Sequence, residues 1–441
     1  MILLDRAEKI KCYGLKCTYF LGFFALMLMS FFSMITDKFG SRAGKVVMVL
    51  GVLLLLRQWR YFLKSPIFYF ILAVIGIQLL SWGLSHLDHP QWAEDSPKVG
   101  RMLAWFMFVP VAFFLQGDTK KILFIGILAM ASVFISPWVT GDGMQEIMRG
   151  INGRRVDFGV HNAQHIAMLF GVSLILGFYC LFIGHQRKNH KLIWFVLGTL
   201  VVVISALGVV VTQTRAVWLG LVAVLLSITL GYLIVSLRSR KLNRAGLVGL
   251  LAIFTILIGL FSSNFGDTLS NRVKSEFSNV KTVLSGSSDY KANSSTGIRL
   301  TTWTESLEWI AERPFAGWGG NGRELVVKHS DRLTERNKER FRHLHNSYLD
   351  TLVNYGVLGL MCLFGLFVYW GYLVKRTYTR QALSAPTLVM LSMLLIFWLV
   401  INCFESYMYY SSGSYILALI GGTILSVYWK TTGFFEETDR V

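Results

Sequence analysis

Apolar segments long enough to cross a membrane recur along the whole chain, separated by short polar stretches. Each holds roughly 15 to 20 residues, and a helix that rises about 1.5 Å per residue needs about that length to span a hydrocarbon layer of ~30 Å. We therefore predict an all-α integral membrane protein with twelve spanning helices. The predicted spans are approximately residues 18–36, 40–56, 65–84, 102–115, 122–139, 166–184, 192–211, 216–237, 245–261, 348–374, 384–402 and 415–429.

The composition supports a membrane protein and excludes other classes. Hydrophobic residues make up 54% of the 441 residues and charged residues only 15%, against about 25% charged residues in typical soluble domains. Soluble globular, disordered and fibrous proteins are excluded on this ground. The five cysteines are odd in number, lie in or beside apolar segments and show no spacing typical of disulfides or metal sites.

The positive charges indicate which way the chain crosses the membrane. With the N-terminus in the cytoplasm, the short cytoplasmic connections hold 21 Lys and Arg residues and the short outer ones hold nine, in agreement with the positive-inside rule. The first span follows four basic residues and lacks a signal-peptide cleavage site, so we expect it to be retained. Topology explains much of the net charge of +18, and we predict no nucleic-acid partner.

One outer connection, residues 262–346, is much longer than the others. We divide the chain into helices one to nine (1–261), this periplasmic loop (262–346), and the last three helices with the cytoplasmic C-terminus (347–441). The internal cytoplasmic connections have only six to eight residues and are too short to hold a nucleotide. We therefore expect any chemistry on the outer face.

The long loop contains patterns of its own. Apolar residues recur at helical spacing at Leu300, Trp303, Leu307 and Ile310. This spacing predicts an amphipathic helix over 297–312, with Thr296 as N-cap, lying on the membrane or on the helix bundle. A turn-rich segment follows at 314–322, and charges of both signs predict a solvated helix over 323–342.

Two arginines on the outer side are candidates for binding an anion. Arg215 lies in a short outer turn between two spans, where a lone basic residue has no topological use and a charge is costly in hydrocarbon. Arg299 falls in the first turn of the predicted 297–312 helix, where the helix dipole favours an anion and disfavours a cation. The plain alternative is an exposed surface arginine, and for Arg299 the spacing alone favours that alternative.

Two histidines precede the tenth span. Ser347 and Asp350 match a capping box, so His343 and His345 would stand at the outer lip of a helix that begins at Ser347. A helix N-terminus disfavours imidazolium and keeps the ring neutral, as a general base requires. Interfacial histidines without a catalytic role fit the pattern equally well. A metal site is disfavoured because no acidic or Cys partner lies at ligand spacing nearby in the sequence.

Further polar residues lie close to these segments. At the outer mouth of the sixth span, a polar cluster is expected to bind substrate or to shape the loop; its candidates are Arg154, Arg155 and His161. Glu405 lies beside three tyrosines and is a candidate for sugar binding, although tyrosines are also expected at membrane interfaces. The glycine-rich segment 317–322 lacks the Gly-Lys-Ser/Thr of a phosphate loop, so we do not expect ATP to be used.

Four short patterns follow one another on the outer side of the membrane: Thr-Gln-Thr-Arg215-Ala, Gly-Ile-Arg299-Leu, Pro-x-x-Gly317-x-Gly319 and His343-Leu-His345-Asn346. Their order, on a chain of twelve predicted spans with one long late outer loop, resembles the bacterial O-antigen ligase family and its polymerase relatives. The patterns themselves cover about 212–220 and 297–350, whereas the topology covers nearly the whole chain.

The resemblance implies a metal-independent glycosyltransferase of the bacterial inner membrane that needs no cofactor. Such an enzyme transfers a glycan from undecaprenyl pyrophosphate to a sugar hydroxyl of the lipid A core oligosaccharide at the periplasmic face, in lipopolysaccharide biosynthesis. Carried over by motif, Arg215 and Arg299 would hold the pyrophosphate and His345 would be the base. His343 is the rival, because the doubled histidine leaves the match ambiguous by two residues.

Three other functions are open at this point. An O-antigen polymerase and a protein O-oligosaccharyltransferase would use the same donor with another acceptor. A transporter of lipid-linked glycans would also have many spans, but no ionisable residue lies near the middle of a predicted span, where transport sites are usually found.

Overall fold

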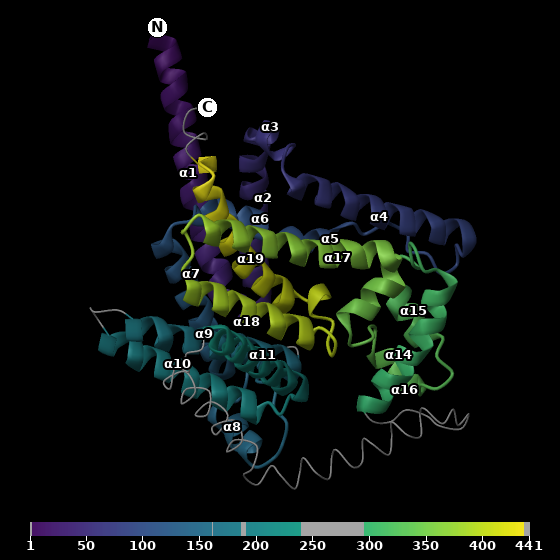
Figure 1. The fold of residues 1–441 in the computed structure, drawn as a ribbon. Helices are drawn as coiled ribbons and strands as arrows, with labels where there is room; N and C mark the ends of the chain where they lie inside the picture. Colours follow the sequence, from purple (N-terminus) through teal and green to yellow (C-terminus); the bar gives the residue numbers. More distant parts are fainter. Residues whose placement is uncertain (1, 161, 187–190, 240–294, 436–441) are drawn as a thin grey trace.

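The computed structural model describes residues 2–160, 162–186, 191–239 and 295–435, and every regular element among them is a helix (Figure 1). The predicted all-α class is confirmed for this part of the chain. In chain order the elements are α1 (Ile2–Phe32), α2 (Asp37–Arg57), α3 (Trp59–Phe62), α4 (Pro66–Asp88), α5 (Gly100–Leu103), η1 (Ala104–Phe106), α6 (Phe108–Leu115), α7 (Thr119–Val139), α8 (Met144–Ile151), α9 (Ala163–Gln186), α10 (Lys191–Val211), α11 (Arg215–Ser239), α14 (Ser295–Glu312), α15 (Gly322–Lys328), α16 (Glu335–Arg340), α17 (Ser347–Thr379), α18 (Ala385–Ile401), η2 (Tyr407–Tyr409) and α19 (Ser411–Thr431).

Most of the predicted spans coincide with helices. Eleven of the twelve do so, and the remaining one, 245–261, lies outside the described residues. Within the described part of the chain, nine helices are long and apolar enough to cross a membrane: α1, α2, α4, α7, α9, α10, α11, α17 and α19. Two predicted spans are shorter, because α18 has 17 residues and 102–115 is divided among α5, η1 and α6. The count of twelve spans stays a prediction.

Helices α9 and α19 form the interior of the bundle. Their most apolar windows are 61% and 67% buried, whereas those of the other seven long helices are at most 39% buried. α9 packs against α10 and α18, and α19 packs against α6 and α17. The outer helices expose large apolar side chains such as Leu230 and Val368. This distribution is expected for helices whose outer faces contact lipid rather than water.

Helices α14, α15 and α16 gather at the N-terminal end of α17 (Figure 1). α14 and α15 share a small hydrophobic core with α17 and the loops between them, formed by Ile298, Trp318, Val326, Val327, Leu333, Leu344 and Val353. α14 packs against both α15 and α17. The amphipathic helix predicted over 297–312 is therefore confirmed as α14, which lies against the helix bundle.

Three local predictions for this region were wrong. α14 begins at Ser295, so Thr296 lies inside the first turn instead of capping it. Leu307, predicted on the apolar face, is 58% exposed, because the buried face is lined partly by small polar residues such as Thr302 and Ser306. The single solvated helix expected over 323–342 is two short helices, α15 and α16, and the first of them contributes to the small core.

The predicted tenth span contains a break. At Gly356, inside α17, φ is 62° and ψ is −163°, far from helical values. The backbone N–H of Val357 donates to the carbonyl of Pro314 at 2.8 Å, and that of Leu358 donates to the carbonyl of Phe315 at 3.2 Å. The turn-rich segment after α14 thus satisfies donors that a restarting helix leaves without an intrahelical partner. The break ties the outer helices to the bundle.

Replacing Gly356 by alanine is expected to destabilise the protein markedly. A Cβ there would lie 2.2 Å from the carbonyl oxygen of Phe315, and the positive φ alone costs a side-chain-bearing residue about 1 to 3 kcal/mol. Gly76 in α4 is the matched control, because a Cβ at that position meets no atom within 4 Å. Thermal unfolding in detergent should show a lower melting temperature for Gly356→Ala only. Equal melting temperatures of the two variants would show that the break is not strained.

Candidate functional site

Two loops meet where α17 begins: the loop that precedes it and the loop between α18 and α19. The side chain of Asn346 accepts hydrogen bonds from the backbone N–H groups of Tyr348 and Leu349 at 3.0 and 3.1 Å. Ser347 Oγ donates to Asn402 Oδ1 at 2.6 Å and so joins the two loops. The helix begins at Ser347 as predicted, but the predicted capping box is wrong, since the N-cap is Asn346.

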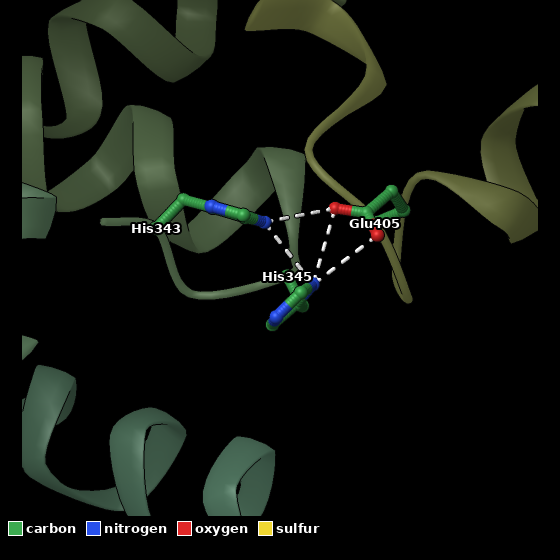
Figure 2. Close-up of side chains that lie close together, drawn as sticks. All are labelled: His343, His345 and Glu405. Carbon is green, nitrogen blue, oxygen red and sulfur yellow. Dashed lines mark hydrogen bonds and ion pairs between the residues drawn. The ribbon is translucent and has the colours of Figure 1, made fainter. Parts of the chain in front are cut away.

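His343, His345 and Glu405 come together at this junction (Figure 2). Glu405 Oε1 lies 3.1 Å from His343 Nε2, and both carboxylate oxygens lie 3.2 Å from His345 Nδ1. The two ring nitrogens are 3.1 Å apart. The sequence singled out all three residues but placed Glu405 apart from the histidines, because it follows His345 by 60 positions.

The protonation states of this cluster follow from its burial. Burial alone would raise the pKa of Glu405, but its contacts with His345 and His343 hold that pKa well below its usual range. Burial lowers the pKa of His345; Glu405 opposes this effect, and His343 and Arg299 add to it. The cluster therefore combines an ionised carboxylate with a neutral His345.

The two histidines differ in the ring nitrogens that they engage. His343 uses both, since its Nδ1 lies 3.2 Å from the hydroxyl of Tyr410 while its Nε2 contacts Glu405. Among the residues that the structure describes, His345 is hydrogen-bonded only through Nδ1, which leaves Nε2 for a substrate. His345 also has a φ of 53°, a left-handed conformation that is strained for a residue with a side chain.

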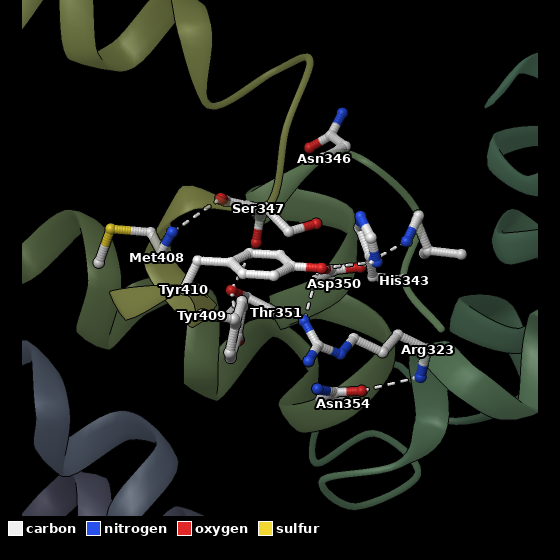
Figure 3. Close-up of polar contacts among 12 residues, drawn as sticks. Arg323, His343, Asn346, Ser347, Asp350, Thr351, Asn354, Met408, Tyr409 and Tyr410 are labelled. Carbon is white, nitrogen blue, oxygen red and sulfur yellow. Dashed lines mark hydrogen bonds and ion pairs between the residues drawn. The ribbon is translucent and has the colours of Figure 1, made fainter. Parts of the chain in front are cut away.

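A buried ion pair holds the segment that carries the histidines (Figure 3). Asp350 Oδ2 accepts from Arg323 Nη1 at 3.0 Å, and Oδ1 accepts from the backbone N–H of Leu344 at 3.0 Å. The guanidinium carbon of Arg323 lies 4.7 Å from the ring centre of Tyr409. Because Leu344 stands between the two histidines, Asp350 fixes the backbone of both. Sequence reasoning missed Arg323, which it had placed on a solvated helix.

Replacing Asp350 by asparagine is expected to destabilise the protein and to slow its activity. The change leaves the largely buried Arg323 without a countercharge, and breaking a buried pair in this way costs about 3 to 5 kcal/mol. The melting temperature in detergent should fall strongly for Asp350→Asn and recover in part in the double variant Arg323→Gln/Asp350→Asn. The control is Glu335, whose side chain is 82% exposed beside Lys338, because Glu335→Gln should change stability by about 0.5 kcal/mol or less. No recovery in the double variant would contradict the pairing.

Three arginines lie near this cluster. Surrounding protein atoms partly desolvate the Arg155 guanidinium and lower its pKa, although the residue is exposed, and the positive charges of Arg299 and Arg215 lower it further. Arg299 also lowers the pKa of His345. The structure therefore brings together the two arginines that the sequence singled out and adds Arg155 as a third. Converging guanidinium groups disfavour a further cation and favour an anion with several charged oxygens.

The remaining predicted site residues lie outside this arrangement or outside the described residues. Arg154 is exposed, and its side chain makes no hydrogen bond or ion pair with any residue that the structure describes. His161 lies outside the described residues. The carboxylate of Glu405 is fully buried and engaged by both histidines, so it supports the histidines instead of facing solvent.

The histidine and glutamate side chains also have a spacing that suits a metal ion. Among the described residues, the ligand atoms of His343, His345 and Glu405 all lie within 4.8 Å of one another. The sequence shows no acidic partner near these histidines, but folding brings Glu405 to them from 60 positions away. The positive charges of Arg155 and Arg299 nearby weigh against a bound cation.

Comparisons with known proteins found one matching family model and one related protein. Residues 200–364 match the family model described as O-antigen ligase, and this segment carries Arg215, Arg299 and the two histidines, whereas Arg155 and Glu405 lie outside it. An uncharacterized protein of Haemophilus influenzae is 23% identical over 327 residues, which are 64% of this chain and 79% of that protein. Over residues 200–364, the chain is similar to the O-antigen ligase family.

Proposed function

We propose that the protein is an O-antigen ligase of the bacterial inner membrane. It transfers a glycan from undecaprenyl pyrophosphate to a sugar hydroxyl of the lipid A core oligosaccharide at the periplasmic face. The observation that carries this proposal is the meeting of a neutral histidine, held by a buried carboxylate, with three arginines at one end of the helix bundle. An acid–base group beside an anion site is what transfer from a pyrophosphate requires.

In this proposal the arginines bind the donor. Negative charge grows on the pyrophosphate oxygens as the bond to the sugar breaks, and guanidinium groups can hold these oxygens through paired hydrogen bonds. Arg215 and Arg299 form the clamp, and Arg155 extends it. Clustered arginines repel one another without a ligand, and a bound pyrophosphate relieves this repulsion.

His345 acts as the general base. Its Nε2 takes the proton of the acceptor hydroxyl while the hydroxyl oxygen forms a bond to the anomeric carbon of the donor sugar. The bond between that carbon and the pyrophosphate oxygen breaks, and undecaprenyl pyrophosphate leaves with the electron pair. Glu405 orients the ring through Nδ1 and stabilises the imidazolium that forms. A single displacement inverts the anomeric centre.

The same arrangement explains why neither ATP nor a metal ion is required in this mechanism. The sugar is already activated by its pyrophosphate, and the arginines supply the positive charge that a metal ion supplies in other transferases.

An enzyme is favoured over a transporter by where the buried ionisable groups lie. Among the described residues, the buried acids and histidines are Glu146, His165, Asp350 and Glu405. Each lies near an end of a spanning helix or outside the spanning helices. Transport sites are instead found near the middle of the membrane. The polymerase and the protein O-oligosaccharyltransferase differ from the ligase only in the hydroxyl that accepts the glycan.

The test is a reaction with the purified protein in detergent, lipid-linked glycan as donor, lipid A core as acceptor, EDTA present and no ATP. Transfer to the core supports the ligase and its metal independence. Growth of the glycan on the donor lipid would identify a polymerase, and transfer to an acceptor protein an oligosaccharyltransferase. Absence of all three activities would overturn the proposal and favour the transporter. Activity that EDTA abolishes and Zn²⁺ restores would overturn the metal-free mechanism.

A further inference from the structure

A second feature of the bundle lies away from the histidines. A cavity of about 240 Å³ is lined by side chains of α17, α18 and α19, with one residue of α9. Its walls are mostly apolar and include Phe367, Trp370, Leu391, Leu395 and Ile420. Figure 1 shows α17, α18 and α19 side by side in this part of the bundle. The cavity is therefore placed within the membrane-spanning region.

The length of the cavity corresponds to one leaflet of a bilayer. On α17 its lining extends from Phe367 to Tyr378, which is about 16 Å along the helix axis. On α18 it extends from Leu388 to Trp398, which is about 15 Å. Both lengths are close to half of the ~30 Å hydrocarbon thickness. A single acyl chain of one leaflet matches this space.

One end of the cavity is basic. Lys375 lines it, is exposed, and makes no hydrogen bond or ion pair with the part of the chain that the structure describes. Arg376 lies in the last turn of α17 and Arg380 is its C-cap, and Arg380 Nη1 donates to the carbonyl of Thr431 at 3.0 Å. Basic groups between spanning helices at a membrane surface attract anionic lipid headgroups. Lys375 is thus suited to pair with a lipid phosphate.

Trp370 lines the cavity and carries a buried hydrogen-bond donor. Trp370 is 7% exposed, and its indole N–H has no hydrogen-bond partner among the described residues. An unsatisfied buried donor is costly, so an acceptor is expected beside it. Trp370 precedes Lys375 by five residues, or about 7.5 Å along the helix axis. In a phospholipid, the ester carbonyls lie on the hydrocarbon side of the phosphate, in the direction of Trp370.

We propose that the cavity binds one anionic phospholipid. Its phosphate pairs with Lys375, an ester carbonyl accepts the hydrogen bond of Trp370 Nε1, and one acyl chain extends along the cavity toward Trp398. The prenyl chain of the proposed donor lacks a carbonyl for Trp370, and its pyrophosphate is assigned to the opposite end of α17, beside His345. The phospholipid site therefore stands independently of the proposed glycan transfer.

The test is native mass spectrometry of the purified full-length protein with added phosphatidylglycerol or phosphatidylcholine. The wild type should retain one phosphatidylglycerol in preference to phosphatidylcholine. Lys375→Gln should weaken retention of phosphatidylglycerol about fivefold, the effect of one cation near an anionic lipid, and should abolish the preference. Gly371→Leu should reduce retention of both lipids, because Gly371 lines the cavity and a Cβ there meets no protein atom within 4 Å.

Two control variants separate this site from general effects of charge or size. Lys64 is an exposed lysine near the same end of the bundle, because Tyr61, three residues before it, makes an edge-to-face contact with Phe434 just after α19. Lys64→Gln should therefore bind like the wild type. Gly76→Leu adds the same side chain in open space on α4 and should also bind like the wild type. The proposal would be overturned if a variant and its control lost lipid retention equally. It would also be overturned if the wild type and Lys375→Gln retained undecaprenyl phosphate equally well.

Discussion

Alanine at Arg215 or at Arg299 is expected to abolish glycan transfer while the protein remains folded in the membrane. Each guanidinium would stabilise negative charge that grows only as the pyrophosphate leaves, and removing one such donor typically slows an enzyme by about 10²- to 10³-fold. The loss should appear mainly in kcat, because charge on the leaving group is greatest in the transition state. The measurement is the rate of transfer from lipid-linked glycan to lipid A core, with the folded state checked by size-exclusion chromatography.

Two further variants make this result specific. Arg336 lies exposed on α16, and Arg336→Ala removes the same charge from the outer region without touching the site, so its rate should equal that of the wild type. Arg299→Lys keeps the charge but loses the paired hydrogen bonds of a guanidinium, so an intermediate rate is expected. If Arg215→Ala or Arg299→Ala transferred glycan at the wild-type rate, the pyrophosphate clamp would be refuted.

The helices could be predicted from the sequence because the membrane imposes a simple rule. Apolar runs of sufficient length must satisfy their backbone groups internally, so helix is the only structure open to separate segments. Interruptions were missed, because they depend on contacts between distant segments. Nothing in the sequence around Gly356 shows that the carbonyls of Pro314 and Phe315 would accept hydrogen bonds from the restarting helix.

The site could be predicted only in part, for the same physical reason. Arg215, Arg299 and the two histidines lie at recognisable positions, at helix starts or in a turn between spans. The role of Glu405 was missed, because Glu405 lies in the loop between α18 and α19 and the histidines lie in the loop before α17. No local sequence pattern shows that these two loops meet. Asp350 was taken for part of a capping box, but its carboxylate instead holds Leu344 and Arg323. Residue spacing over a few positions predicts contacts within one helix or turn. It does not predict contacts between side chains that are distant in the sequence.

The choice of base is the second prediction with a large effect. His345→Ala should lose transfer by about 10²- to 10⁴-fold, the usual contribution of a positioned base. His343→Ala should lose much less, since both of its ring nitrogens are occupied by Glu405, His345 and Tyr410 and its role is to support the carboxylate. The glycan-transfer rates of the two purified variants decide whether His345 or His343 is the base. An inactive His343→Ala beside an active His345→Ala would reverse the assignment.

The pH dependence of transfer provides an independent check on the same base. Burial lowers the pKa of His345 below the 6.5 of a free imidazole, and only the neutral ring can accept a proton. The rate should therefore be constant above pH 6.5 and fall in more acidic solution. Glu405 raises the pKa of His345, so Glu405→Gln should move the acidic fall to still lower pH. The same change should reduce the maximum rate, because the imidazolium formed in the reaction loses its countercharge. If the residual activity of His345→Ala kept the wild-type pH profile, the titrating group would be another residue.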